Sequence, residues 1–149
     1  MYGVTGRMGL NQHLVRSIVA IRQQGGVALP NGDRVMPDPI LVGRNAEKVA
    51  ALAREYGIER STTDLDAALK NPGDEVFFDA ATTQMRADLL TRAIQAGKHV
   101  YCEKPIADSL DKAVAVAKLA KLAKIKNGVV QDKLFLPGLR KIKLLRDSG

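Results

Sequence analysis

The chain has 149 residues, which is enough for one domain with one hydrophobic core. Only 4% of its residues are aromatic and none is tryptophan, a composition that suits helices packed on a parallel sheet of aliphatic strands. It has no long apolar run and no charged N-terminal stretch followed by an apolar one. A membrane span and a signal peptide are therefore not expected, and we expect a cytoplasmic protein.

The net charge of +7 is concentrated in the last third of the chain. There Lys118, Lys121 and Lys124 recur every third residue, opposite an apolar set that comprises Leu119, Leu122 and Ile125. This spacing is typical of the solvated face of an amphipathic helix. A basic stripe can also attract nucleic acid, but no aromatic residue is interleaved with the lysines of 112–126. We therefore expect no nucleic-acid partner.

A glycine-rich turn lies at the start of the chain, at Gly3–Gly9, and leads into a predicted helix that ends at Gly25–Gly26. In such a turn a glycine lets the backbone approach a pyrophosphate, and the free amides at the helix start favour the anion. The glycine spacing is GxxGxxG rather than the usual GxGxxG. The residues expected to bind a cofactor here are Gly3, Thr5, Gly6, Arg7, Met8 and Gly9.

A dinucleotide-binding turn normally follows a buried central strand, yet only Met1 and Tyr2 precede Gly3. We therefore expect the first strand to be largely missing and the chain to be truncated at its N-terminus. Its two neighbouring strands would then have unpaired backbone edges in the middle of the sheet.

The second strand is predicted at 40–42, after an insertion at 27–39 that contains a tight turn at 30–33. Arg44 follows this strand, where an acidic residue ordinarily binds the ribose hydroxyls of NAD. A guanidinium can instead pair bidentately with a 2′-phosphate. The sequence thus favours NADP over NAD, unless Arg44 is only a surface residue at a helix start.

Helices and strands alternate along the remainder of the chain, which predicts an α/β fold with a doubly wound parallel sheet of the Rossmann type. The expected helices span 46–56, 64–70, 85–96, 110–126 and 138–147, and the expected strands span 60–62, 75–81 and 129–135, with one more between Gly97 and Glu103.

The strand after Gly97 ends in Glu103, Lys104 and Pro105. Ligands of open parallel sheets bind outside the carboxyl ends of the strands, so Glu103 and Lys104 are expected to face the cleft. The alternative is a surface Glu–Lys pair before a loop proline. Within the strand, Cys102 is expected to be a small buried hydrophobe and His99 a structural residue.

Residues 96–105 resemble the strand and turn written AGKHV.CEKP in the glucose–fructose oxidoreductase and inositol dehydrogenase (Gfo/Idh/MocA) family, and the resemblance extends from Gly3 to Gly149. It implies that Glu103, Lys104 and Pro105 lie at the cofactor, with the Lys104–Pro105 bond cis. It also implies that Lys104 lies beside the nicotinamide and the substrate as a catalytic residue. A lysine there can orient a substrate hydroxyl or carbonyl and favour its alkoxide form.

One segment departs from the pattern of this family, and another resembles a different family. Thr82, Thr83 and Gln84 replace the family's Thr-Pro-Asn turn, and Arg86 stands near the position of a family histidine. Thr82 still offers a hydroxyl to the cofactor. The GxxGxxG turn resembles that of dihydrodipicolinate reductase, which implies that Arg7 holds the adenosine end.

The resemblance implies the nucleotide-binding half of a two-domain NAD(P)-dependent oxidoreductase for a sugar, polyol or similar carbonyl–alcohol pair. The intact enzyme would bind this small-molecule substrate and form a homo-oligomer. The substrate domain would follow Gly149, so the chain alone is expected to bind cofactor at best and to be inactive.

Two other functions remain open on the sequence. One is a non-catalytic module that senses a cofactor or binds a partner, and the other is a basic nucleic-acid binder with salt-sensitive DNA binding. His13 and His99 lie far apart, and neither a metal-spaced carboxylate–histidine cluster nor a Ser-His-Asp set is evident. We therefore expect neither a metal site nor a hydrolase.

Overall fold

A computed structural model describes all residues, 1–149. The strands are β1 (Val27–Ala28), β2 (Arg34–Val35), β3 (Ile40–Val42), β4 (Arg60–Thr62), β5 (Val76–Asp79), β6 (His99–Cys102) and β7 (Asn127–Val129). The helices are α1 (Ala20–Gln23), α2 (Ala46–Glu55), α3 (Leu65–Lys70), α4 (Thr83–Gln95), α5 (Leu110–Leu122) and α6 (Pro137–Ser148). A π-helical segment, η1 (Gly9–Val19), runs directly into α1, and η2 (Asp132–Phe135) is a 3₁₀ turn.

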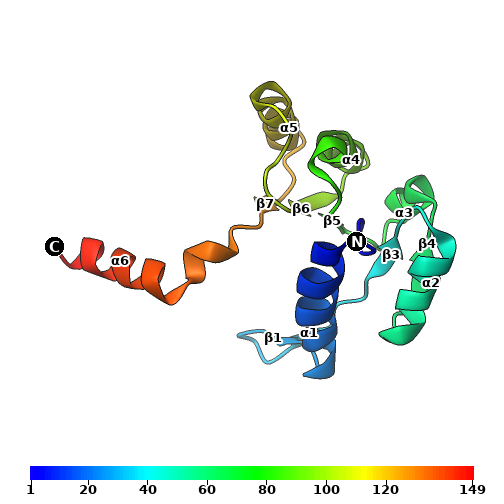
Figure 1. The fold of residues 1–149 in the computed structure, drawn as a ribbon, viewed down its shortest axis with the longest axis horizontal. Helices are drawn as coiled ribbons and strands as arrows, with labels where there is room; N and C mark the ends of the chain where they lie inside the picture. Colours follow the sequence, from blue (N-terminus) through cyan, green and yellow to red (C-terminus); the bar gives the residue numbers. More distant parts are fainter.

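Two groups of parallel strands form the sheet, β3 with β4 and β5 with β6 and β7. Tyr2 lies between the groups and forms parallel bridges to Val42 at the end of β3 and to Asp79 at the end of β5. The spatial order is therefore β4, β3, Tyr2, β5, β6, β7. This is the expected doubly wound parallel arrangement, with helices on both faces (Figure 1).

The central position of the sheet is occupied over two residues only. The amide of Tyr2 donates to the Phe78 carbonyl at 2.9 Å, and the amide of Ala80 donates to the Tyr2 carbonyl at 2.9 Å. On the other side, the amide of Val42 donates to the Met1 carbonyl at 2.8 Å. The expected gap in the sheet is thus closed at the carboxyl ends of β3 and β5.

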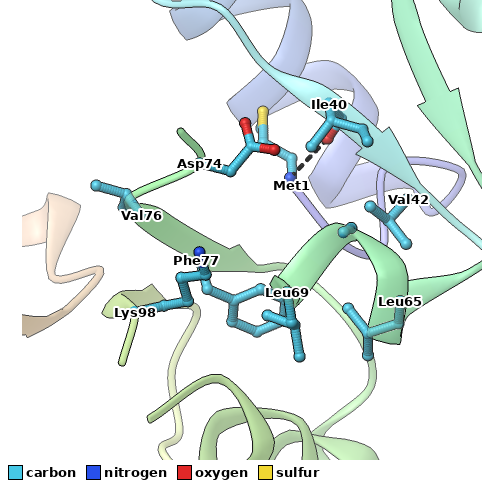
Figure 2. A pocket seen from close by; sticks show the side chains of 10 residues that line it. Met1, Ile40, Val42, Leu65, Leu69, Asp74, Val76, Phe77 and Lys98 are labelled. Carbon is cyan, nitrogen blue, oxygen red and sulfur yellow. Dashed lines mark hydrogen bonds between the residues drawn. The ribbon is translucent and has the colours of Figure 1, made fainter. Parts of the chain in front are cut away.

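Below Met1 the central position remains open as a groove of about 490 Å³. It follows the amino-terminal parts of β3 and β5, and its lining residues include Pro39, Ile40, Val76 and Phe78. The Met1 α-amino group donates to the Ile40 carbonyl at 2.8 Å, and Figure 2 shows this bond from the opposite face of the sheet. The joint between the two strand groups is therefore short.

Two hydrophobic cores cover the two faces of the sheet. Neighbouring side chains of a strand point to opposite faces, so Leu41 and Val42 belong to different cores. The first core packs η1 and α2 on β3 through Val4, Leu14, Val19, Leu41, Val49, Ala53 and Ile58. The second packs α3, α4 and α5 on the sheet through Val42, Leu65, Leu69, Phe77, Leu89, Leu90, Ala93, Ile94, Val100, Cys102, Val116 and Ala120.

Local capping explains where several helices start. The side chains of Asn45, Asp64 and Ser109 accept hydrogen bonds from backbone amides in the first turns of α2, α3 and α5. At the other end of α4, Gly97 has φ +75°, a left-handed conformation that stops the helix at little cost. These signals are local, and the predicted starts of these helices are confirmed to within two residues. The helix predicted at 110–126 ends earlier, at Leu122, so Lys124 and Ile125 lie beyond it.

The predicted strand at 129–135 is wrong. β7 pairs with β6 only as far as Val129, opposite Cys102, and the chain then leaves the sheet because β6 has ended. Leu134 and Phe135 are exposed in η2, and α6 projects away from the sheet (Figure 1). On α5, Leu122 is 81% exposed and does not join the expected apolar face.

Candidate functional site

A pocket of about 150 Å³ opens at the carboxyl edge of the sheet, between the ends of β3 and β5. It brings together predicted cofactor-binding residues from three separate segments of the chain. Its lining residues are Tyr2, Gly3, Thr5, Gly6, Gly43, Arg44, Ala80, Ala81, Thr82 and Met85. This is the edge at which an open parallel sheet ordinarily holds its ligand.

The three glycines of the turn serve different purposes. Gly3 has φ +85°, and a Cβ there would lie 2.6 Å from the Ala80 carbonyl carbon, while a Cβ on Gly9 would collide with the Gly3 carbonyl. Gly3 and Gly9 are therefore required by the fold itself. A Cβ on Gly6 would meet only the Gly3 carbonyl oxygen, at 3.4 Å. Gly6 thus leaves a face of the pocket open to a ligand.

Other residues predicted around the turn lie outside this pocket. Arg7 and Met8 are exposed beside it, and Gly9 is buried against Gly3. Arg44 does line the pocket and follows β3 directly after Gly43. Gly43 was not predicted, although a Cβ there would lie 2.7 Å from a methyl group of Val49 on α2.

Thr82 lies at the start of α4 in an extended conformation and makes no capping hydrogen bond with its side chain. The residue is exposed and lines the pocket. Its hydroxyl is therefore available to a ligand, and its predicted contact with the cofactor stays a prediction. Ala80, Ala81 and Met85, which also line the pocket, were not predicted.

The turn at 103–105 begins at the end of β6. The Lys104–Pro105 peptide bond is cis, as the family resemblance implies. Lys104 and Pro105 are exposed, but Glu103 is only 6% exposed. Glu103 was expected to face the cleft, and it is buried instead. Its Oε1 lies 2.7 Å from Nε2 of His13, and its Oε2 accepts a hydrogen bond from the Lys104 amide at 3.0 Å. Both carboxylate oxygens are thus engaged within the protein.

His13 connects the first helix to this turn. Its ring lies 4.7 Å from the ring of Phe78 on β5, and its Nε2 pairs with Glu103. Sequence reasoning gave His13 no role, because it lies far from His99 and belongs to no metal-spaced cluster, and the pairing with Glu103, 90 residues further along the chain, was not predicted. One signal in the sequence could have pointed to this contact. A carboxylate at the end of a buried strand needs a hydrogen-bond partner nearby.

A buried ion pair lies behind the pocket. Nε of Arg86 donates to Oδ2 of Asp79 at 2.7 Å, and the two side chains are 3% and 0% exposed. The same guanidinium donates to the carbonyls of Pro105 at 2.5 Å and Ala81 at 2.6 Å. Burial raises the pKa of the Asp79 carboxyl, although hydrogen bonds from Arg86 and the Ala81 amide oppose the shift.

Cys102 and His99 are structural, as expected. Cys102 is 2% exposed, and burial raises the pKa of its thiol to about 11, which keeps it a thiol at neutral pH. Nδ1 of His99 accepts a hydrogen bond from the Lys126 amide at 3.3 Å. No group of three or more His, Cys, Asp or Glu residues is arranged to hold a metal ion. None of the helices is long and apolar enough to cross a membrane.

Residues 39–130 match the Gfo/Idh/MocA family, described as an oxidoreductase family with an NAD-binding Rossmann fold. The chain belongs to this family. It is 47% identical, over all of its 149 residues, to a D-xylose dehydrogenase of Paenarthrobacter nicotinovorans. It spans 38% of the length of that relative.

Two solved structures extend the comparison. A levoglucosan dehydrogenase in complex with NADH and levoglucosan superposes with a TM-score of 0.83 at 26% identity, over 99% of this chain and 38% of that one. A biliverdin reductase of Synechocystis sp. PCC 6803, in complex with biliverdin and NADP⁺, gives a TM-score of 0.59 at 26% identity, over 70% of this chain and 33% of that one. The NAD-binding Rossmann fold and the predicted family are thereby confirmed.

Proposed function

We propose that this chain is the cofactor-binding domain of an NAD(P)-dependent oxidoreductase that acts on a sugar or a related polyol. The observation that carries the proposal is the pocket at the carboxyl edge, in which the glycine-rich turn, Arg44 and Thr82 meet. The similarity to a D-xylose dehydrogenase and to a levoglucosan dehydrogenase supports a sugar as the substrate class.

The pocket residues fit a nicotinamide dinucleotide. Gly6 offers open space to a pyrophosphate at the start of the first helix, and the Thr82 hydroxyl is free to donate a hydrogen bond. When bound, the cofactor supplies the hydride acceptor or donor of the reaction. The substrate would be held by a further domain, since the matched relatives are longer than this chain.

Lys104 is the residue that we propose for catalysis. It is exposed just after the end of β6, where it follows the buried Glu103 and precedes the exposed Pro105. Its ammonium would donate a hydrogen bond to the substrate oxygen and stabilise the negative charge that develops there as the hydride moves. Lys104 thus polarises the substrate, while the pocket residues bind and orient the cofactor.

The preferred cofactor is proposed to be NADP. Arg44 lines the pocket directly after β3, and Arg7 is exposed beside the turn, so two guanidinium groups are available to a 2′-phosphate. Relatives include one solved with NADH and one with NADP⁺, so the choice rests on these arginines.

Isothermal titration of the chain with NADPH and NADH tests the cofactor proposal. We expect NADPH to bind more tightly, and we expect Arg44→Asp to reverse the preference because a carboxylate repels the 2′-phosphate. Arg54→Asp, at an exposed arginine in the last turn of α2, is the matched control and should keep the preference. Equal affinities for both cofactors, or tighter binding of NADH, would refute the NADP assignment.

The role of Lys104 is tested in a full-length enzyme built on this chain. Lys104→Ala should lower kcat on the order of 100-fold and leave cofactor affinity within a few-fold, because the interaction acts mainly in the transition state. Lys118→Ala, at an exposed lysine of α5, is the control and should leave both values unchanged. Near-normal turnover of Lys104→Ala would contradict a catalytic role and indicate that Lys104 is only a surface residue.

A further inference from the structure

The buried guanidinium of Arg86 joins three segments that meet at the edge of the sheet. We propose that Arg86 is a positioning residue that fixes the turn at 103–105 and thereby sets the place of Lys104. This inference rests on the proposed catalytic function of Lys104. Arg86 lies near the position at which the family has a histidine.

The hydrogen bonds of Arg86 go to the end of β5 and the residues after it, and to the turn that follows β6. Its Nε, Nη1 and Nη2 donate, respectively, to the Asp79 carboxylate at 2.7 Å, the Pro105 carbonyl at 2.5 Å and the Ala81 carbonyl at 2.6 Å. A planar guanidinium can serve three acceptors in fixed directions, whereas a lysine ammonium is a point charge. An arginine therefore fits this arrangement of acceptors better than a lysine does.

Stability alone does not account for this buried pair. Charges removed from water lose their hydration, and apolar residues of similar volume often serve a core as well as a buried ion pair does. Asp79 uses its second oxygen, Oδ1, to accept from the Ala81 amide at 3.1 Å. Every partner of the pair therefore belongs either to the loop that lines the pocket or to the turn that carries Lys104.

The turn is held on both sides of Lys104. Before it, Glu103 is bonded to His13 on η1, and after it, the Pro105 carbonyl is bonded to Arg86 on α4. The Lys104 side chain is exposed between these two attachments. Loss of the Arg86 bonds would free the C-terminal side of the turn and let Lys104 move relative to the pocket.

Hydrogen–deuterium exchange of the chain tests the positioning without any cofactor. In Arg86→Lys we expect the amides of Glu103, Lys104, Ile106 and Ala107, the residues of 103–107 that carry one, to exchange about tenfold faster, while β3 and the first core keep their protection. Arg92→Lys is the matched control on the same helix, because the Arg92 side chain is 37% exposed and pairs with Asp66 at the surface. It should leave the exchange of 103–107 unchanged.

Two exchange results would overturn the proposal. One is unchanged protection of 103–107 in Arg86→Lys, and the other is equally faster exchange of every segment, which would make Arg86 a general support of the domain. In Arg86→Ala, millimolar guanidinium chloride should restore protection of 103–107, because the free ion can occupy the vacated site. Failure of this rescue also counts against a specific role of the guanidinium.

Kinetics of the full-length enzyme then connect Arg86 to Lys104. Arg86→Lys should lower kcat on the order of 100-fold with little change in cofactor KM, and it should add little to Lys104→Ala in the double variant. Additive losses would show that Arg86 does not act through Lys104. If Lys104→Ala alone has normal turnover, the proposed catalytic function fails, and the exchange experiment still decides whether Arg86 positions the turn.

Discussion

The α-ammonium of Met1 makes the stability of this chain depend on pH. Burial lowers its pKa from 8.0 to about 5, and Arg60 adds to this shift while Asp74 opposes it. Figure 2 shows the nitrogen against the Ile40 carbonyl, with the Asp74 side chain near it. The folded chain therefore binds this proton more weakly than the unfolded chain does.

The sign and size follow from linkage. Between pH 8 and pH 5 the unfolded amine is protonated while the folded amine is largely neutral, so stability falls as the pH falls through this range. A shift of about three pKa units corresponds to about 4 kcal/mol in total, of which roughly 3 kcal/mol is lost between pH 8 and pH 5. That is a large share of a typical stability of about 5–15 kcal/mol.

Urea unfolding of the free chain and of the Nα-acetylated chain at both pH values measures this effect. Acetylation removes the titrating group, and the groove of about 490 Å³ below Met1 has room for an acetyl group. The free energy of unfolding of the acetylated chain, relative to that of the free chain, should rise by about 3 kcal/mol from pH 8 to pH 5. The other titrating groups are the same in both chains and cancel in this difference. Parallel pH dependences for the two chains would refute the reasoning.

Two further predictions concern the sheet. Adding about five aliphatic residues before Met1 should raise the thermal midpoint by many degrees and make the chain more monodisperse, because a strand can then pair with the open edges of β3 and β5. Calorimetry and light scattering check this, and an unchanged midpoint would contradict it. Cys102 should react with Ellman's reagent only as fast as the chain unfolds, because its thiol is 2% exposed and its pKa is about 11. Rapid labelling of the folded chain would show that β6 opens locally.

The elements that the sequence predicts correctly are those with local signals. Asn45 and Asp64 cap their helices with bonds to amides three residues ahead, and Gly97 ends α4 through its own backbone conformation. The strand expected at 129–135 failed because its length depends on a partner. β6 ends at Cys102, and apolar residues such as Phe135 have no further strand to pair with.

The candidate site divides in the same way. The turn at Gly3–Gly9 and Arg44 were found because each follows from its place relative to a strand end or a helix start. The ion pairs that organise the site were missed because their partners lie far apart, with 90 residues between His13 and Glu103. Arg86 sits only seven residues from Asp79, but a charged residue in the first turns of a helix ordinarily points to solvent.

The pocket and the central joint of the fold are made from the same atoms. Tyr2 joins the two groups of strands, and Gly3 packs so tightly on Ala80 and Ala81 that no side chain fits between them. Arg44, on the opposite wall, belongs to the other group of strands. A ligand that fills the pocket would contact both groups, which backbone hydrogen bonds join only through Met1 and Tyr2. We therefore expect binding of the proposed cofactor in this pocket to stabilise the sheet, with part of the binding free energy acting as stability of the fold.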